Sequence, residues 1–273
     1  MNGYNVAING EMFPVQPGFE AAVNSYVEKI VEWNPITQNA AIFYQFTTKQ
    51  MEGQYIQILP DGCMDMLFCC SAEKPAAIIY GKKVSSKSIA LERGCTYFGF
   101  RPMSVDGLKQ NAFSMKEIVN DEISFSEVFS DNGLIERLTQ AAIFEKRINE
   151  FKQYLKNHFV DQDFKMNLSY YCFLQICRSQ GNIKIEQIAR NSGYSERYLR
   201  KKYEEIYGIS PKKFAQIVMF QGSLNKIIKN NISKMDIVYE NGYYDQSHLI
   251  HQFKKFTTTA PTEFIRLIDR MSC

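Results

Sequence analysis

The rear of the chain repeats one arrangement of apolar and polar positions. The first copy runs from Ile185 to Phe214 and the second from Met235 to Phe264. Each copy has a short amphipathic segment, a Gly-Tyr pair, a longer amphipathic segment, and a proline followed three residues later by phenylalanine. Apolar positions three or four apart indicate helices, and glycine suits the turn between them. The repeat therefore predicts two helix-turn-helix units in tandem.

Capping residues and apolar spacing predict where the helices of this region begin and end. Ser195 and Asp245 are the candidate N-caps for the second helix of each unit. A long helix, roughly Pro211 to Asn230, is expected to join the units, with a bracing helix over Leu168–Arg178 and a closing helix over Pro261–Ile268. The expected inward positions are Ile185, Ile188, Ala189, Tyr198, Leu199, Tyr203 and Ile206 in the first unit, Leu249, Phe253 and Phe256 in the second, and Phe214, Ile217, Val218, Leu224 and Ile228 in the joining helix. Ile237, Val238 and Tyr239 are expected to precede the turn of the second unit at Asn241-Gly242.

The front of the chain changes from a helical to a strand pattern. Phe19 to Trp33 has apolar residues three or four apart, which predicts a helix ending at Pro35. Between Ala40 and Arg101 there follow six short β-rich runs separated by turn formers such as Pro60-Asp61-Gly62. Short strands at this spacing predict a small antiparallel β-barrel or sandwich.

Helical spacing returns after Pro102 and continues to Phe159. One amphipathic stripe, Ile148, Phe151, Leu155 and Phe159, is expected either to pack on the strands or to form a homodimer interface. The polar stretch at 160–163 is the expected linker, which divides the chain into a regulatory region, 1–160, and a DNA-binding region, 161–273. The fold class expected is α+β: a small antiparallel β-barrel or sandwich with flanking helices, then an all-α domain.

Charge separates the two halves. The chain carries a formal net charge of +3, yet residues 1–150 hold 13 Lys and Arg against 18 Asp and Glu, while 151–273 hold 19 against 11. A basic rear half is the candidate for binding a polyanion, and the second helix of a helix-turn-helix unit enters the major groove of DNA. Double-stranded DNA is therefore the expected partner.

The polar faces of the two expected recognition helices supply the candidate DNA contacts. In the first helix, arginine or lysine near the N-terminus can bind guanine or phosphate. In the second, glutamine can pair with adenine, while lysines further along are expected to contact phosphate. The alternative is that these polar residues form an ordinary solvent-exposed helix face with no role in DNA binding. The candidates are Ser195, Glu196, Arg197, Arg200 and Lys201 in the first helix, and Gln246, Ser247, His251, Gln252, Lys254 and Lys255 in the second.

Two segments of the rear half resemble the DNA-binding domain of AraC/XylS-family bacterial transcription regulators. They are GYSERYLRKKYEEIYGISPKKF and GYYDQSHLIHQFKKFTTTAPTEF. The four residues DQSH, Asp245–His248, are especially characteristic of that family. The resemblance implies that Ser195–Lys201 and Gln246–Gln252 enter adjacent major grooves and that the protein activates transcription with RNA polymerase. The chain departs from the family pattern at three positions of the joining helix where basic residues are usual, Gln216, Met219 and Gly222. It also has Thr258 in place of a glycine and Ala260 in place of a capping serine or threonine.

The front half is similar to a small PDGC-motif domain of unknown function that accompanies many such regulators. The similar residues are LPDGCMDMLF at 59–68, Gly81 and FGFRP at 98–102. The resemblance implies control by a small-molecule effector or by a protein partner. The candidate residues for an effector pocket are Tyr44, Phe46, Met64, Met66, Phe68, Tyr97 and Phe100. The alternative is that these side chains simply pack in the hydrophobic core.

Catalytic and metal chemistry find little support. The sequence has no G-x-x-x-x-G-K, HExxH or GxSxG motif, so we expect neither an enzyme nor a cofactor or metal. Asp61 is expected to form a turn, and Asp65 is expected to face solvent or accept a hydrogen bond. Seven cysteines without a CxxC pair are expected to stay reduced, with a thiol or metal sensor as the alternative. No apolar run of membrane-spanning length and no signal peptide are evident, which predicts a cytoplasmic protein.

Overall fold

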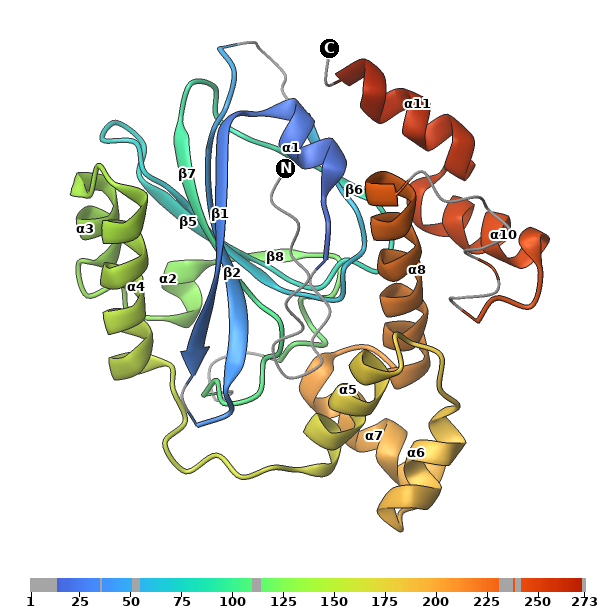
Figure 1. Ribbon diagram of the computed structural model, residues 1–273. Helices are drawn as coiled ribbons and strands as arrows, with labels where there is room; N and C mark the ends of the chain where they lie inside the picture. The colour runs from blue at the N-terminus through green and yellow to red at the C-terminus, as the bar shows by residue number, and fades with distance from the viewer. Residues whose placement is uncertain are drawn as a thin grey trace.

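The computed structural model describes residues 14–34, 36–50, 55–109, 114–230, 238 and 242–271. The fold is mixed α+β, as expected: antiparallel strands form the front half and helices the rear half (Figure 1). No helix in these described ranges is long and apolar enough to cross a membrane.

Six strands form the main sheet and two form a smaller one. The order in the main sheet is β1-β2-β7-β4-β5-β8, and every neighbouring pair is antiparallel. The smaller sheet pairs β3 with β6. The strands are β1 (Asn24–Asn34), β2 (Asn39–Thr47), β3 (Tyr55–Ile58), β4 (Asp65–Cys69), β5 (Ala76–Tyr80), β6 (Lys87–Ala90), β7 (Thr96–Pro102) and β8 (Glu122–Ser124).

The two faces of the main sheet bury different side chains because successive residues of a strand point to opposite sides. On one face Ile42, Tyr44 and Phe46 share a core with residues of the smaller sheet, such as Ile56 and Ile89. The two sheets therefore form the sandwich that the strand pattern predicted. The opposite face belongs to a second, larger core.

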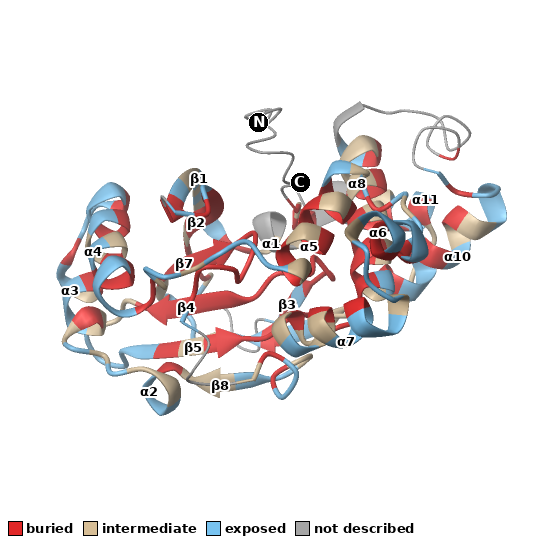
Figure 2. Cartoon of the chain, turned by 90° about the horizontal axis from the view of Figure 1, so that it is seen from below, coloured by how far each residue is buried: buried red, intermediate tan, exposed pale blue. Residues whose placement is uncertain are grey.

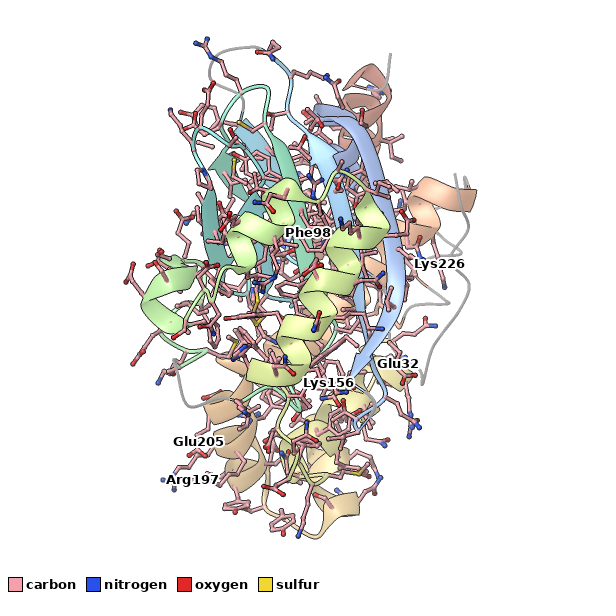
Figure 3. All side chains as sticks on the ribbon, turned by 90° about the vertical axis from the view of Figure 1, so that its left-hand side faces the viewer. Glu32, Phe98, Lys156, Arg197, Glu205 and Lys226 are labelled. Carbon is pink, nitrogen blue, oxygen red and sulfur yellow. The ribbon has the colours of Figure 1, made fainter. Side chains whose placement is uncertain are left out.

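Three helices follow the strands: α2 (Phe125–Val128), α3 (Leu134–Gln140) and α4 (Phe144–His158). The ring of Phe151 on α4 lies 4.9 Å from that of Phe100 and 6.0 Å from that of Phe98. Ile148, Leu155 and Phe159 are buried in the same core, and Figure 3 shows Phe98 behind these helices. The predicted core packing of the stripe is confirmed, and the stripe is not available as a homodimer surface.

The predicted helix over Phe19–Trp33 is wrong. Only α1 (Pro17–Ala22) is helical, and β1 occupies the rest. β1 pairs with β2 from Val27↔Gln45 to Asn34↔Asn39. That pairing involves a partner strand outside the segment, so helical spacing within the segment alone could not reveal it, although its β-branched valines and isoleucine favour a strand. Pro35, the expected helix end, lies outside the described residues.

The rear helices occur where the repeat predicted them. They are α5 (Leu168–Arg178), α6 (Ile185–Ser192), α7 (Glu196–Tyr207), α8 (Pro211–Asn230), α10 (Gln246–Thr257) and α11 (Pro261–Met271). Ile237, Tyr239 and Asn241, which the sequence assigns to the first helix and turn of the second unit, lie outside the described residues. Val238 is buried.

One hydrophobic core extends from the sheet into these helices. Phe43 and Phe151 belong to it, as do Tyr207 on α7 and Phe214 on α8. Figure 2 shows buried residues in β4 and β7 and also on the inner faces of α5 and α7. The front half therefore holds the rear helices by direct packing. The boundary at residue 160 stays a prediction.

Candidate nucleic-acid interface

The first helix-turn-helix unit consists of α6, a turn and α7. Gly193 turns the chain with φ of 75°, in the left-handed region where glycine is favoured. Ser195 then caps α7, because its side chain accepts a hydrogen bond from the Tyr198 amide at 3.2 Å. Both features match the sequence prediction. Leu199, Tyr203 and Tyr207 are buried, which fixes the face that α7 turns to solvent.

Tyr198 lies outside the core, contrary to the prediction. Its exposed fraction is 43%, and its ring stacks on that of Tyr194 at 5.2 Å. The inner face of α7 is set by the four-residue spacing of Leu199, Tyr203 and Tyr207, and Tyr198 is one position, about 100° around the helix, from Leu199. A tyrosine ring and hydroxyl in solvent can contact a nucleic-acid backbone.

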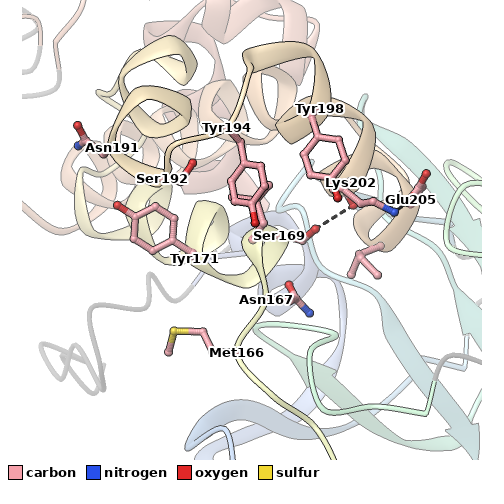
Figure 4. A pocket seen from close by; sticks show the side chains of 12 residues that line it. Met166, Asn167, Ser169, Tyr171, Asn191, Ser192, Tyr194, Tyr198, Lys202 and Glu205 are labelled. Atoms are coloured by element: carbon pink, nitrogen blue, oxygen red, sulfur yellow. Dashed lines mark hydrogen bonds and ion pairs between the residues drawn. The ribbon is translucent and has the colours of Figure 1, made fainter.

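An open groove of about 720 Å³ adjoins these two tyrosines (Figure 4). Met166, just before α5, and Tyr171, within α5, form its other side. Ser169 donates a hydrogen bond to the Lys202 carbonyl at 2.8 Å across its floor. The groove thus joins the bracing helix to the recognition helix of the first unit.

The predicted basic residues of α7 face solvent. Arg197, Arg200 and Lys201 are exposed, and Figure 3 shows Arg197 and Glu205 projecting from the helix. Arg200 pairs with Glu196, and Lys201 Nζ lies 4.0 Å from a Glu205 oxygen. Ion pairs this exposed contribute little to stability, so they can exchange for contacts with phosphate or bases.

The described part of the second unit, a glycine turn followed by α10, repeats the turn and capped helix of the first. Gly242 has φ of 76°, and Asp245 caps α10 by accepting a hydrogen bond from the His248 amide at 2.7 Å. The predicted inward residues Leu249, Phe253 and Phe256 are buried. The polar residues that remain exposed are Gln246, Ser247, His251, Lys254 and Lys255.

Gln252 does not lie on this outward face, which corrects the sequence prediction. It is 9% exposed, its Nε2 lies 3.4 Å from His248 Nε2, and its Oε1 has no hydrogen-bond partner among the described residues. The cause is its spacing: three residues after Leu249 and four before Phe256 place it on the apolar stripe. Gln252 therefore supports α10 from within and does not reach a base edge.

α8 joins the two units through its buried side chains. Phe214 packs 5.3 Å from Phe173 of α5, while Phe220 packs 4.9 Å from Phe256 of α10. Ile217, Val218 and Leu224 are buried as predicted. Ile228 is 42% exposed, contrary to the prediction, because Ile227 takes the inward position. A single helix therefore sets the positions of both recognition helices.

The turn at Leu59–Cys63 of the front half contacts α8. Gln221 of α8 donates a hydrogen bond to the Pro60 carbonyl at 2.8 Å and accepts one from the Val15 amide at 2.9 Å. Gly62 has φ of 74°, and a Cβ there would lie 2.7 Å from the Phe214 ring. Only glycine combines this backbone with so close an approach, so the turn is shaped to fit α8.

A buried arginine stabilises the same turn. Arg101 Nε donates to Asp65 Oδ1 at 2.9 Å, and its Nη1 lies 3.5 Å from Asp61 Oδ2. Asp61 Oδ1 accepts from the Cys63 amide at 2.9 Å, and Tyr44 donates its hydroxyl to Asp65 at 2.7 Å. The sequence assigned Asp61 to a turn and Asp65 to solvent or a hydrogen bond. It missed Arg101, which is distant in the chain and joins both carboxylates.

A second buried charge lies where α7 meets the sheet. Lys82 is 1% exposed, with its Nζ 4.6 Å from the ring centroid of Tyr207. Burial lowers the pKa of Lys82 to about 8, with Cys63 and Asp106 acting in the opposite direction. Asp106 accepts hydrogen bonds from Tyr207 and, at 2.6 Å, from Ser104. Sequence reasoning missed this cluster, although the lysine pair after the apolar AAIIYG run was a visible signal.

The predicted effector pocket is not a single site. Tyr44, Phe46 and Tyr97 lie in the sandwich core, whereas Met64, Met66, Phe68 and Phe100 belong to the core beneath α4. The sheet separates the two groups, because they occupy positions that point to opposite faces. The cavity beside Tyr44 and Arg101 measures about 20 Å³, room for one water molecule.

A larger groove of about 780 Å³ lies at the open side of the sandwich, between the β4–β5 hairpin and β6. Leu67, Ile78 and Tyr97 line its apolar part, and Lys74 and Arg93 lie at its edge. Its volume is within the range of small-molecule sites. Of the predicted pocket residues, Tyr97 lines this groove.

None of the cysteines in the part of the chain that the structure describes forms a disulfide bond. Burial raises the pKa of Cys69 and of Cys70 to about 11, and that of Cys172 to about 12. A raised thiol pKa lowers reactivity because the thiolate is the nucleophile. No group of three or more potential metal ligands occurs among the described residues.

Two capped helices on glycine turns, each with an exposed polar face, define a DNA-binding region of the helix-turn-helix class. Residues 188–267 match the family described as "Helix-turn-helix domain". The C-terminal region of the chain thus carries a helix-turn-helix domain.

Three known proteins share parts of the chain. The chain is 28% identical over 90 residues to a probable transcription factor, PqrA, of Proteus vulgaris. This alignment covers 33% of this chain and 73% of PqrA. A DNA-binding transcriptional dual regulator of Escherichia coli K-12 aligns over 40% of this chain and 99% of its own, at 20% identity and a TM-score of 0.35. ToxT of Vibrio cholerae aligns over 89% of this chain and 99% of its own, at 13% identity and a TM-score of 0.43.

Proposed function

We propose that this protein is a sequence-specific transcriptional activator that inserts α7 and α10 into successive major grooves on one face of DNA. The observation that carries the proposal is that both units place a capped, exposed recognition helix directly after a glycine turn. Ser195 and Asp245 cap helices whose polar faces are exposed, and α8 packs against both units. A duplex turns once in about 34 Å, so a rigid joining helix suits a bipartite site.

The exposed residues divide into base readers and phosphate contacts. In α7, Arg197, Arg200 and Lys201 are positioned for guanine and phosphate, with Ser195 and Glu196 at the helix start. The α10 helix presents Gln246, Ser247 and His251 near its N-terminus, which suits neutral contacts to base edges. Lys254 and Lys255 follow at its C-terminal end and are assigned to phosphate.

The test begins with in vitro selection of duplexes from a random library by the full chain. We expect two half-sites about one helical turn apart. Gln246→Ala should change the preferred sequence of one half-site. Lys254→Ala should weaken binding to all duplexes alike and make the salt dependence shallower by about 0.9 in log–log slope. A library that yields no preferred sequence with the wild-type chain would overturn the proposal.

The front half, residues 1–160, is proposed to regulate the DNA-binding half, residues 161–273. For a small organic effector, the groove between the β4–β5 hairpin and β6 offers apolar walls at Leu67 and Ile78 and cations at its edge. A screen of metabolites by thermal unfolding of the full chain tests this, since a ligand that binds only the folded state raises its stability. Ile78→Trp, which fills the groove, should abolish the shift.

Control by a protein partner is the second candidate, and the filled cores around Tyr44 and Phe68 favour it over a preformed internal pocket. Transcription in vitro with purified RNA polymerase and a promoter carrying the selected site tests activation. Added effector should change transcript yield in the first case. In the second, only a cell-derived protein fraction should do so.

A further inference from the structure

A loop of the front half lies against the C-terminal end of the recognition helix α7. A Cβ at Gly208, the residue that ends α7, would lie 2.6 Å from the Met115 carbonyl oxygen and 2.9 Å from the Lys116 nitrogen. Met115 and Ile118 are buried in the main core, which anchors the loop on both sides of Lys116. The front half therefore contacts the first unit at the C-terminal end of its recognition helix.

The loop has a defined conformation. The Lys116 amide donates to Ser114 Oγ at 3.3 Å, and the Glu117 amide to the Ser114 carbonyl at 3.0 Å. Further along, the Asn120 amide donates to the Lys82 carbonyl at 3.0 Å and its side chain accepts from the Val84 amide at 2.9 Å. Because these bonds order the backbone, a ligand of Lys116 need not order the loop on binding.

Lys116 determines the charge of a groove between this loop and α7. The groove measures about 920 Å³ and is open to solvent. The helix contributes Arg197, Arg200 and Lys201 to its lining, together with three glutamates, so the formal charges of α7 cancel there. Lys116, whose side chain is exposed, adds the unmatched positive charge. Two of the glutamates are already ion-paired to cations of α7.

We propose that the sugar-phosphate backbone of one DNA strand lies in this groove, with a phosphate bound by Lys116. The inference rests on the proposed function, because a helix in the major groove has a phosphate backbone along each side. The 114–116 loop lies beside the end of α7, where one of those backbones must pass. The DNA interface then spans both halves of the chain, and the front half contributes a phosphate contact of its own.

The test uses the full chain and a duplex selected from a random library. Lys116→Gln removes the charge, and the matched control, Lys146→Gln, removes one from α4 on the other side of the sheet (Figure 1). The loss of one phosphate contact should make the slope of log affinity against log salt shallower by about 0.9, and should weaken binding about fivefold at 0.15 M salt on selected and random duplexes alike. Lys146→Gln should match the wild type.

Two further measurements separate a phosphate contact from a structural effect. Lys116→Arg should restore the wild-type slope, because arginine also binds phosphate. Phosphate ethylation interference should show one phosphate whose modification blocks the wild type but not Lys116→Gln. An unchanged slope with the same set of interfering phosphates would overturn the inference while leaving the proposed function intact. Failure of the wild type to select any duplex would instead count against the proposed function.

Discussion

Arg101 is the residue whose removal tests most directly how the front half is held together. Its guanidinium lies between two buried carboxylates, 2.9 Å from Asp65 and 3.5 Å from Asp61. Arg101→Gln keeps part of the side-chain stem but leaves both aspartates without their cation. Breaking a buried ion pair by removing one partner costs about 3–5 kcal/mol, because the remaining charge is uncompensated. We expect the lower end, about 3 kcal/mol, since glutamine can still donate a hydrogen bond.

The size of this loss should depend on pH. Burial raises the pKa of Asp61, and Arg101 opposes that rise. Without Arg101 the pKa of Asp61 in the folded state rises further. A carboxyl whose pKa is higher when folded than when unfolded stabilises the protein at low pH, and this stabilisation is lost as pH rises through the folded-state pKa. The deficit of the variant should therefore be smaller at pH 5 than at pH 7.5.

Urea unfolding measures both effects, with the fluorescence of the single tryptophan, Trp33, as the signal. Trp33 is buried, and its ring lies 5.8 Å from that of Phe100, next to Arg101 in the chain. Asp61→Asn in the Arg101→Gln background removes one uncompensated charge and should recover part of the loss at pH 7.5 but little at pH 5. A loss below about 1 kcal/mol, or an equal loss at both pH values, would refute the reasoning.

Two further predictions concern backbone conformation. Thr258 ends α10 with φ of 69°, in the left-handed region that is unfavourable for a β-branched residue, so Thr258→Gly should raise the free energy of unfolding by about 1 kcal/mol. Thr257→Gly is the control: Thr257 lies within the helix and its hydroxyl donates a hydrogen bond to the Phe253 carbonyl, so this change should lower the free energy of unfolding. Thermal unfolding in which both substitutions change stability in the same direction would contradict the prediction. Gly62→Ala should destabilise the contact with α8, because its Cβ would lie 2.7 Å from Phe214. Limited proteolysis of the 160–167 connector should then become faster, and Phe214→Leu in the same chain should reverse this if the ring is the cause.

Features with local causes were predictable from the sequence. The caps at Ser195 and Asp245 and the turns at Gly193 and Gly242 each depend on a few adjacent residues, so the repeat alone was enough to predict the helices they bound. Errors on these helices arose at residues that are sequence neighbours of an inward residue: Tyr198 precedes Leu199, and Gln252 precedes Phe253. Tyr198 lies in solvent and Gln252 in the core, because residue type suggested the face while packing determined it.

Features with distant causes were not predictable. β1 depends on its pairing with β2, and the ion pair of Arg101 with Asp65 joins residues 36 positions apart. The predicted effector pocket failed for a different reason: its residues were chosen for type without regard to strand alternation, which sends Tyr44 and Phe100 to opposite faces. The contact of the 114–116 loop with α7 involves segments about 90 residues apart, and no local pattern indicates it.

The Leu59–Cys63 turn physically connects the strands of the front half to the helices of the DNA-binding half. Arg101 and the Cys63 amide fix Asp61 on the sheet side, while Pro60 and Gly62 contact α8 on the other. α8 in turn packs on the bracing helix α5 through Phe214 and on α10 through Phe220. A change in the turn therefore acts on the helix that spaces both recognition helices, and not on one of them alone. For this reason Arg101→Gln, at concentrations of urea where the chain stays folded, should weaken binding to bipartite sites more than binding to a duplex that carries one half-site.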